Sequence, residues 1–134
     1  MKAIRLGGPA LIVGAVLLVL HDVAFRGMAS NQHPDLLAFW LPNHCFLGNS
    51  LAAGRIPTWN PYALAGTPFA ADPQSGWLYL PAMALYAGLP CHVAIRWFVI
   101  AQPLIGGLGM YAFLRNEGLS RPAASVGGVS LALA

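Results

Sequence analysis

The sequence predicts an all-α fold of polytopic membrane helices, with an external loop that carries juxtamembrane helices. Of the 134 residues, 57% are hydrophobic and only 8% are charged, whereas an average soluble domain has about 25% charged residues. Seven basic and four acidic side chains are too few to cover a soluble fold of this size. Two long apolar segments, 6–24 and 94–114, have lengths close to the roughly 20 residues that span a bilayer. A soluble enzyme and a disordered linker are therefore excluded.

The first apolar segment, 6–24, is predicted to be an uncleaved membrane anchor. It follows Lys2 and Arg5, and it is long enough to span only if Asp22 lies at the far headgroup level. A cleaved signal peptide, ending near Ala29, is the alternative, because a charged start and a short apolar core also fit one. We favour the anchor, since the apolar core is long for a signal and Asp22 would crowd the cleavage site.

The less apolar segment 25–93 is predicted to be an external loop. Within it, 42–53 is expected to form a short helix, because Pro42 suits the first helical turn and Gly54 is placed to end it. Its apolar face suits a position on the membrane surface, beside the spans. The stretch that follows is rich in proline and glycine, which predicts a compact loop of turns.

The remaining segments are read from their lengths and their prolines. Segment 77–89 is too short to span upright, is broken by Pro81, and is predicted to be a juxtamembrane or re-entrant helix. Segment 94–114 is the second span, in which Pro103 predicts a kink. Segment 122–134 is expected to be the start of a third span that is cut short. Three glycines of the second span are expected to permit close helix packing: Gly106, Gly107 and Gly109.

The basic residues predict the topology. They are scattered singly along the chain rather than clustered, which excludes a nucleic-acid-binding surface. If 77–89 does not span, Arg115 and Arg121 lie on the same side as Lys2 and Arg5, and the positive-inside rule favours this arrangement. The protein is therefore expected in the cytoplasmic membrane as a multi-pass protein with its amino terminus in the cytoplasm.

The two cysteines, Cys45 and Cys91, have no Cys-x-x-Cys spacing. His44 and His92 each lie directly beside one of them, and adjacent residues rarely bind one metal ion, so no metal site is assigned. We favour two separate, half-buried thiols. A disulfide is the alternative, and it requires both cysteines to face an oxidising compartment.

The external loop carries a recognisable pattern of residues. The pattern comprises Asp35, Pro42, Gly54-Arg55-x-Pro57-x-Trp59-Asn60-Pro61, Gly66-x-Pro68-Phe69, Asp72-Pro73-Gln74 and Tyr79-x-Pro81. It resembles the amino-terminal region of YfhO-like bacterial membrane proteins, within the GT-C class of glycosyltransferases. The resemblance covers nearly the whole chain, and full-length relatives have many more spans. It therefore implies that this chain is the amino-terminal part of such a protein.

The resemblance implies transfer of a sugar from a polyprenyl-phosphate donor on the external face of the bacterial cell envelope membrane. Asp35 occupies the usual catalytic position, in the first external loop after the first span. A carboxylate at a low-dielectric boundary can serve as the base that takes the proton of the acceptor hydroxyl. The alternatives are that Asp35 holds a divalent cation against the donor phosphate, or that it caps the following helical turn.

Four further residues are candidates for substrate binding. Arg55 suits a lipid phosphate, although it also suits the end of the preceding helix. Trp59 suits stacking on a sugar, although such a residue often anchors a loop at the membrane interface. Asp72 and Gln74 suit a second carboxylate and a sugar-hydroxyl partner, although both also suit a turn, as Asn60 does.

A second class of function stays open on the sequence alone. The chain also fits a non-catalytic integral membrane protein, or a small subunit that packs against a membrane partner through its glycine-rich span. Under either reading the lipid bilayer is the first partner. The catalytic reading adds a lipid-linked sugar and the remaining spans of the full-length protein.

Overall fold

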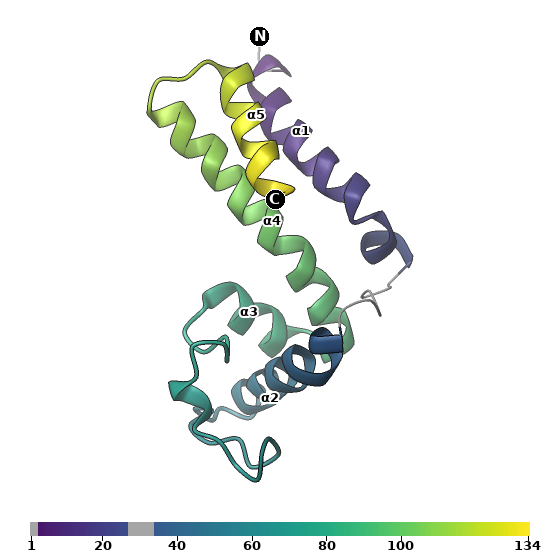
Figure 1. Ribbon diagram of the computed structural model, residues 1–134, viewed down its shortest axis with the longest axis vertical. Helices are drawn as coiled ribbons and strands as arrows, with labels where there is room; N and C mark the ends of the chain where they lie inside the picture. Colours follow the sequence, from purple (N-terminus) through teal and green to yellow (C-terminus); the bar gives the residue numbers. More distant parts are fainter. Residues whose placement is uncertain (1–2, 27–33) are drawn as a thin grey trace. The chain divides into compact units, whose positions relative to one another are not determined.

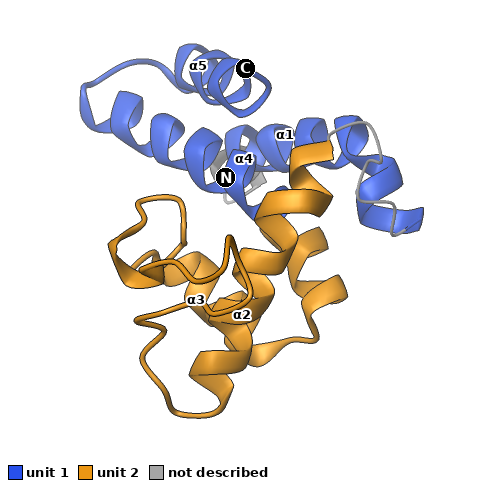
Figure 2. Ribbon diagram, turned by 60° about the horizontal axis from the view of Figure 1, so that its bottom comes forward, with its two compact units in different colours: residues 1–27, 99–134 blue, residues 28–98 orange. Residues whose placement is uncertain are grey.

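The computed structural model describes residues 3–26 and 34–134, with side-chain surroundings from Gly7 onward. The described residues are mostly helical and include no β-strand, which confirms the all-α class. Their α-helices are α1 (Ala3–Val19), α2 (Leu41–Ala52), α3 (Leu80–Gly88), α4 (Cys91–Asn116) and α5 (Arg121–Ala132), as Figure 1 shows. The chain divides into two compact units, 1–27 with 99–134, and 28–98, coloured in Figure 2.

Within the part of the chain that the structure describes, α4 is the one helix long and apolar enough to cross a membrane. It begins at Cys91 and so is longer at both ends than the predicted span. The apolar helical part of α1, Gly7–Val19, is shorter than a span. The π-helical segment η1 (Asp22–Arg26) follows it, where Asp22 pairs with Arg26 at 3.1 Å. A first span over 6–24 therefore stays a prediction.

The first unit consists of α1, α5 and the second half of α4, which pack against one another. Ile12 and Val16 of α1 are fully buried in this unit, against a cluster that includes Ala132 of α5. A Cβ atom added at Gly107 would lie 2.7 Å from the Cβ of Ala132 and 2.9 Å from Cγ2 of Ile12. Close packing at Gly107 is thus confirmed. At Gly109 an added Cβ would meet no atom within 4 Å, so this glycine is not needed for contacts among the described residues.

The connection between α4 and α5 is a tight turn. Leu119 N–H donates to Leu114 O at 3.1 Å, which closes the end of α4. Ser120 then begins α5, and its hydroxyl accepts a hydrogen bond from Ala123 N–H. The helix α5 starts at Arg121, so the short apolar segment predicted over 122–134 is helical through Ala132. Whether it continues as a third span stays a prediction.

Helix α2 of the second unit matches its prediction closely. Pro42 lies in its first turn, where a backbone N–H is not needed. At its end Gly54 has a φ of 67°, Gly54 N–H donates to Leu51 O, and Arg55 N–H donates to Ser50 O. This is a Schellman motif. It favours glycine at position 54, because the residue just after the helix end has a left-handed backbone conformation. The direction in which the chain leaves α2 is therefore set by local backbone hydrogen bonds.

Helix α3 begins later than predicted. The expected helix over 77–89 starts at Leu80, and Pro81 lies in its first turn instead of breaking it. That outcome follows from the missing N–H of proline, which costs nothing in a first turn. Trp77, before the helix, is half-buried and packs against the core of the unit. Pro90 follows the end of the helix.

The core of the second unit joins α2, α3 and the first turns of α4. Its buried residues are Leu47, Phe69, Ala82, Tyr86, Ala94 and Ile95. Helices α2 and α3 approach so closely that a Cβ at Gly48 would collide with the carbonyl of Tyr86. On the apolar face of α2, Leu47 is fully buried by this packing, while Phe46 and Leu51 are half-buried. The position of α2 on the membrane surface stays a prediction.

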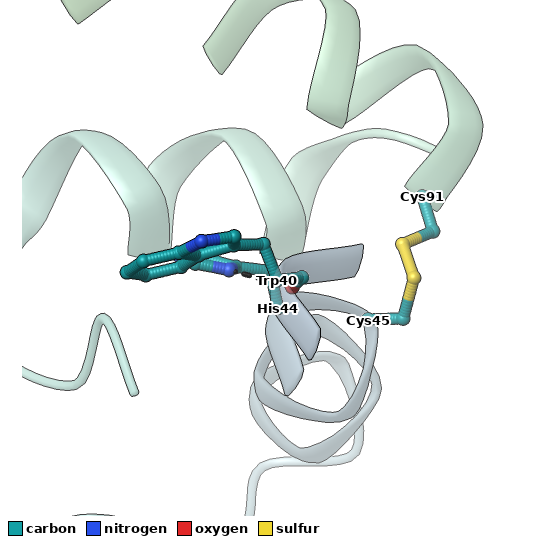
Figure 3. Close-up of a disulfide and its surroundings, with 4 residues drawn as sticks. All are labelled: Trp40, His44, Cys45 and Cys91. Atoms are coloured by element: carbon teal, nitrogen blue, oxygen red, sulfur yellow. Dashed lines mark hydrogen bonds between the residues drawn. A yellow bond between two sulfur atoms is a disulfide. The ribbon is translucent and has the colours of Figure 1, made fainter. Parts of the chain in front are cut away.

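A disulfide joins Cys45 of α2 to Cys91, the first residue of α4 (Figure 3). Their Cα atoms are 5.4 Å apart, within the usual range of about 4.4–6.8 Å. The prediction of two separate thiols is wrong, because the antiparallel return of α3 brings the start of α4 beside α2. Sequence spacing does not reveal that return.

Candidate functional site

Two cavities open side by side on the loop that follows α2. We name them the Arg55 cavity, of about 480 Å³, and the Asn60 cavity, of about 460 Å³, after a residue that lines each. Phe46 and Tyr62 line both. Each has a volume in the range of small-molecule sites, about 300–1,000 Å³. The candidate site is therefore in the second unit, on residues that the pattern of the external loop contains.

Asn60 organises the loop between the two cavities. Its backbone N–H and carbonyl both pair with Thr67 at 2.9 Å, in an isolated antiparallel bridge. Its side-chain Oδ1 accepts from Tyr62 N–H at 3.0 Å, and its Nδ2 donates to Asn43 Oδ1 at 3.3 Å. The predicted turn-forming role is confirmed. The bond to Asn43 adds a link between the loop and α2 that sequence reasoning missed.

The structure brings Arg55 and Trp59 into one cavity. Arg55 follows the Schellman end of α2, and Trp59 begins the turn at Asn60, so both placements arise from local backbone chemistry. Both side chains are exposed. A Cβ at Gly66 would lie 2.7 Å from the Trp59 ring, so the ring rests against a position where only glycine fits. A cation and an aromatic ring thus line the same hollow.

Asp72 lines the Asn60 cavity, and its turn-forming role is also confirmed. Its Oδ1 accepts from Gln74 N–H at 2.8 Å, which fixes the carboxylate in an Asx turn. Gln74 itself is exposed and lines neither of the two cavities. Among the predicted substrate-binding residues, Asp72 therefore lies in one cavity, Arg55 and Trp59 in the other, and Gln74 outside both.

Asp35 lies outside both cavities as well. It is exposed and directly precedes the π-helical segment η2 (Leu36–Trp40), but its side chain makes no capping hydrogen bond there. The helix-cap alternative is thus contradicted. Ala38 and Phe39 of η2 line the Asn60 cavity. No group of three His, Cys, Asp or Glu side chains that could hold a metal ion lies among residues 3–26 and 34–134.

His44 is a buried residue that sequence reasoning left without a role. Its side chain is only 2% exposed, and its Nδ1–H donates to Trp40 O at 2.8 Å. The rings of Trp40, Tyr86 and Phe98 surround it, with centroids 5.7, 4.9 and 5.1 Å away (Figure 3 draws Trp40 and His44). Burial lowers the pKa of His44, so the ring is neutral at pH 7. It is a core residue of the second unit, and its spacing of four from Trp40 was the available signal.

No protein-family model matches the chain, and neither a curated protein nor a solved structure shows significant similarity to it. The resemblance to YfhO-like proteins therefore stays a prediction from the motif residues. Several of these, Arg55, Trp59, Asn60 and Asp72, line the two cavities.

Proposed function

We propose that this chain forms the amino-terminal part of a membrane glycosyltransferase of the GT-C class. The protein transfers a sugar from a polyprenyl-phosphate donor on the external face of the membrane. One observation carries the proposal: Arg55 and Trp59, chosen from the sequence as candidates for substrate binding, line the same cavity. Asp72, a third candidate, lines the cavity beside it.

The chemistry of the Arg55 cavity suits a sugar phosphate. A guanidinium group binds phosphate oxygens through two parallel hydrogen bonds, and an exposed one can meet a headgroup at the membrane surface. The face of Trp59, supported by Gly66, offers an apolar surface for the C–H groups of a pyranose. Asn49 and Thr58 line the same cavity and supply polar groups for sugar hydroxyls.

Asp35 is the proposed catalytic base. It precedes η2, the segment that contributes Ala38 and Phe39 to the wall of the Asn60 cavity. An acceptor held in that cavity would therefore contact residues that lie three and four positions after the carboxylate in the sequence. The base would take the proton of the acceptor hydroxyl as the acceptor oxygen bonds to the anomeric carbon. The bond between that carbon and the donor phosphate oxygen would break in the same step, and polyprenyl phosphate would leave.

The disulfide supports an external location for the second unit. Disulfides persist in oxidising compartments such as the bacterial periplasm and are rare in the cytosol. Because Cys91 is the first residue of α4, the bond also ties the external unit to the start of the proposed span. With α4 crossing the membrane once, the Arg115 turn lies in the cytoplasm, which agrees with the positive-inside rule.

Labelling of single cysteines tests this topology. In a background with Cys45→Ser and Cys91→Ser, an impermeant thiol reagent applied from outside is expected to label Asn49→Cys but not Asn116→Cys. Both positions are exposed, so access depends on the side of the membrane. Asn116→Cys should become reactive once the membrane is permeabilised. Labelling of both positions from outside contradicts the topology.

Substitutions in the Arg55 cavity test the function. In the full-length protein, Arg55→Ala and Trp59→Ala are each expected to raise the KM for the lipid-linked donor by about tenfold, the effect of losing a charged hydrogen bond or a stacked ring. The matched variants Arg55→Lys and Trp59→Phe should lose less, because they keep the charge and an aromatic face. Donor-dependent sugar transfer in proteoliposomes measures this. Unchanged KM values in both alanine variants would remove the donor-binding assignment.

One observation favours the non-catalytic alternative. Added Cβ atoms at Gly7 and Gly14 of α1, and at Gly109 of α4, would meet no atom within 4 Å. Such small residues allow other membrane helices to approach closely. A protein that shows no transfer with any lipid-linked sugar, yet co-purifies with a membrane partner through these helices, would fit this alternative instead.

A further inference from the structure

We propose that the Asn60 cavity is a binding site for an uncharged pyranose, separate from the Arg55 cavity. Its role as the site of the sugar acceptor rests on the proposed function, whereas the binding itself does not. The argument draws on the polar groups, the aromatic rings, the charge and the fixed geometry of the residues that line the cavity.

The polar wall offers both donors and acceptors. Asn60 Nδ2 carries two N–H groups, of which one is used by Asn43 Oδ1, and Asn43 has its own amide nitrogen. The carboxylate of Asp72 has about four acceptor positions and uses one for Gln74 N–H. Thr67 adds a hydroxyl. A sugar hydroxyl both donates and accepts, so this mixed wall suits a ring with several hydroxyl groups.

A second part of the lining is aromatic. Phe39, Phe46, Tyr62 and Phe69 line the cavity. The ring of Phe46 meets the ring of Phe69 edge to face, with centroids 5.0 Å apart and planes at 67°. A pyranose has an apolar face of C–H groups as well as its hydroxyl edge, and it can therefore use both parts of the lining at once. A simple lipid chain would displace water from the Asp72 carboxylate without replacing its hydrogen bonds, at a cost in free energy.

The charge of the cavity selects an uncharged ligand. The described residues that line it include no Lys, Arg or His, and Asp72 is their single acidic residue. A phosphate or a sugar acid would be repelled by this carboxylate and would find no cation. The Arg55 cavity next to it has the opposite character. The two cavities are thus suited to different parts of a reaction, a charged donor and an uncharged acceptor.

The polar groups of the Asn60 cavity are held in place before any ligand binds. Asn60 is 3% exposed and is fixed by its backbone bridge to Thr67 and by the bonds of both its side-chain atoms. Asp72 is fixed by its turn. Side chains that are already ordered lose little conformational entropy on binding, which favours affinity for a small ligand.

Saturation-transfer NMR of the purified 134-residue chain in detergent micelles tests the proposal, with methyl α-glucopyranoside, methyl α-galactopyranoside and methyl α-mannopyranoside as probes. At least one glycoside is expected to bind. Glucose 6-phosphate suits the Arg55 cavity, so it is tested as a competitor, and it is expected to displace the bound glycoside at least tenfold more weakly than free glucose does. Ala38→Trp, at an exposed position on the wall, should abolish binding by filling the cavity. Its control is Ala84→Trp, on the exposed side of α3 and away from both cavities.

A second pair of variants separates binding from folding. Asp72→Asn keeps the turn bond to Gln74 and should weaken glycoside binding about tenfold, while Glu117→Gln makes the same chemical change outside the cavity and should leave it unchanged. Absence of binding by all three glycosides to disulfide-intact, helical protein overturns the proposal, as does binding that survives both Ala38→Trp and Asp72→Asn. A failed donor test at Arg55 would remove the proposed transfer but leave this binding site standing.

Discussion

Replacing Asp35 by Asn is expected to lower the rate of sugar transfer by about 100-fold or more, the usual scale of general-base catalysis. Asn has nearly the same size but cannot take a proton. The fold should tolerate the change, because Asp35 is exposed and makes no capping bond to η2. The measurement is transfer from a polyprenyl-phosphate sugar by full-length protein in proteoliposomes, expressed per amount of inserted protein.

The control for this experiment is Asp72→Asn, the same chemical change at a carboxylate whose turn bond an amide oxygen can preserve. It should reduce transfer less than Asp35→Asn, and mainly by weakening acceptor binding. Near-normal transfer by the Asp35→Asn protein would contradict the catalytic assignment. Normalising to inserted protein ensures that poor accumulation is not mistaken for lost catalysis.

Breaking the disulfide should give the largest change in stability. The bond links residues 46 apart, and the loop-closure relation for such a loop gives a loss of about 4 kcal/mol in the free energy of unfolding. The second unit should lose this stability, because both cysteines lie in it. All four tryptophans of the chain, Trp40, Trp59, Trp77 and Trp97, lie in the same unit, so their fluorescence reports its unfolding.

Denaturant titration of the oxidised protein and of the variant with Cys45→Ser and Cys91→Ser measures this loss as a fall in the unfolding midpoint. Reduced wild-type protein should have the same unfolding midpoint as the variant, since neither has the disulfide. Reductant should not change the midpoint of the variant. Equal midpoints for the oxidised and reduced wild-type proteins would show that the bond contributes no stability.

Features set by neighbouring residues were predictable from the sequence. Pro42 and Gly54 mark the two ends of α2, because proline suits a first turn and glycine suits the left-handed residue that follows a helix. The turns at Asn60 and Asp72 follow from side chains that bond the backbone two residues on. The same reasoning failed at Pro81, where an apolar run before the proline concealed a helix start.

Features that depend on distant residues were not predictable in this way. The Cys45–Cys91 bond requires the return of the chain through α3, and the Asn43–Asn60 bond requires the loop to fold back on α2. Likewise, no local sequence pattern predicts that Asp72 and Arg55 line two different, neighbouring cavities. The residue types of the site were thus available from the sequence, while their grouping came from tertiary contacts.

The disulfide can form only at a late stage of the synthesis of the second unit. A chain is synthesised from its amino terminus at about 5–20 residues per second, so Cys91 follows Cys45, 46 residues earlier, by roughly 2–9 s. Throughout that interval Cys45 is a thiol without its native partner. Because these 134 residues include only two cysteines, no incorrect pairing can form among them. The disulfide of the second unit can therefore close only after the first residue of α4 has been made.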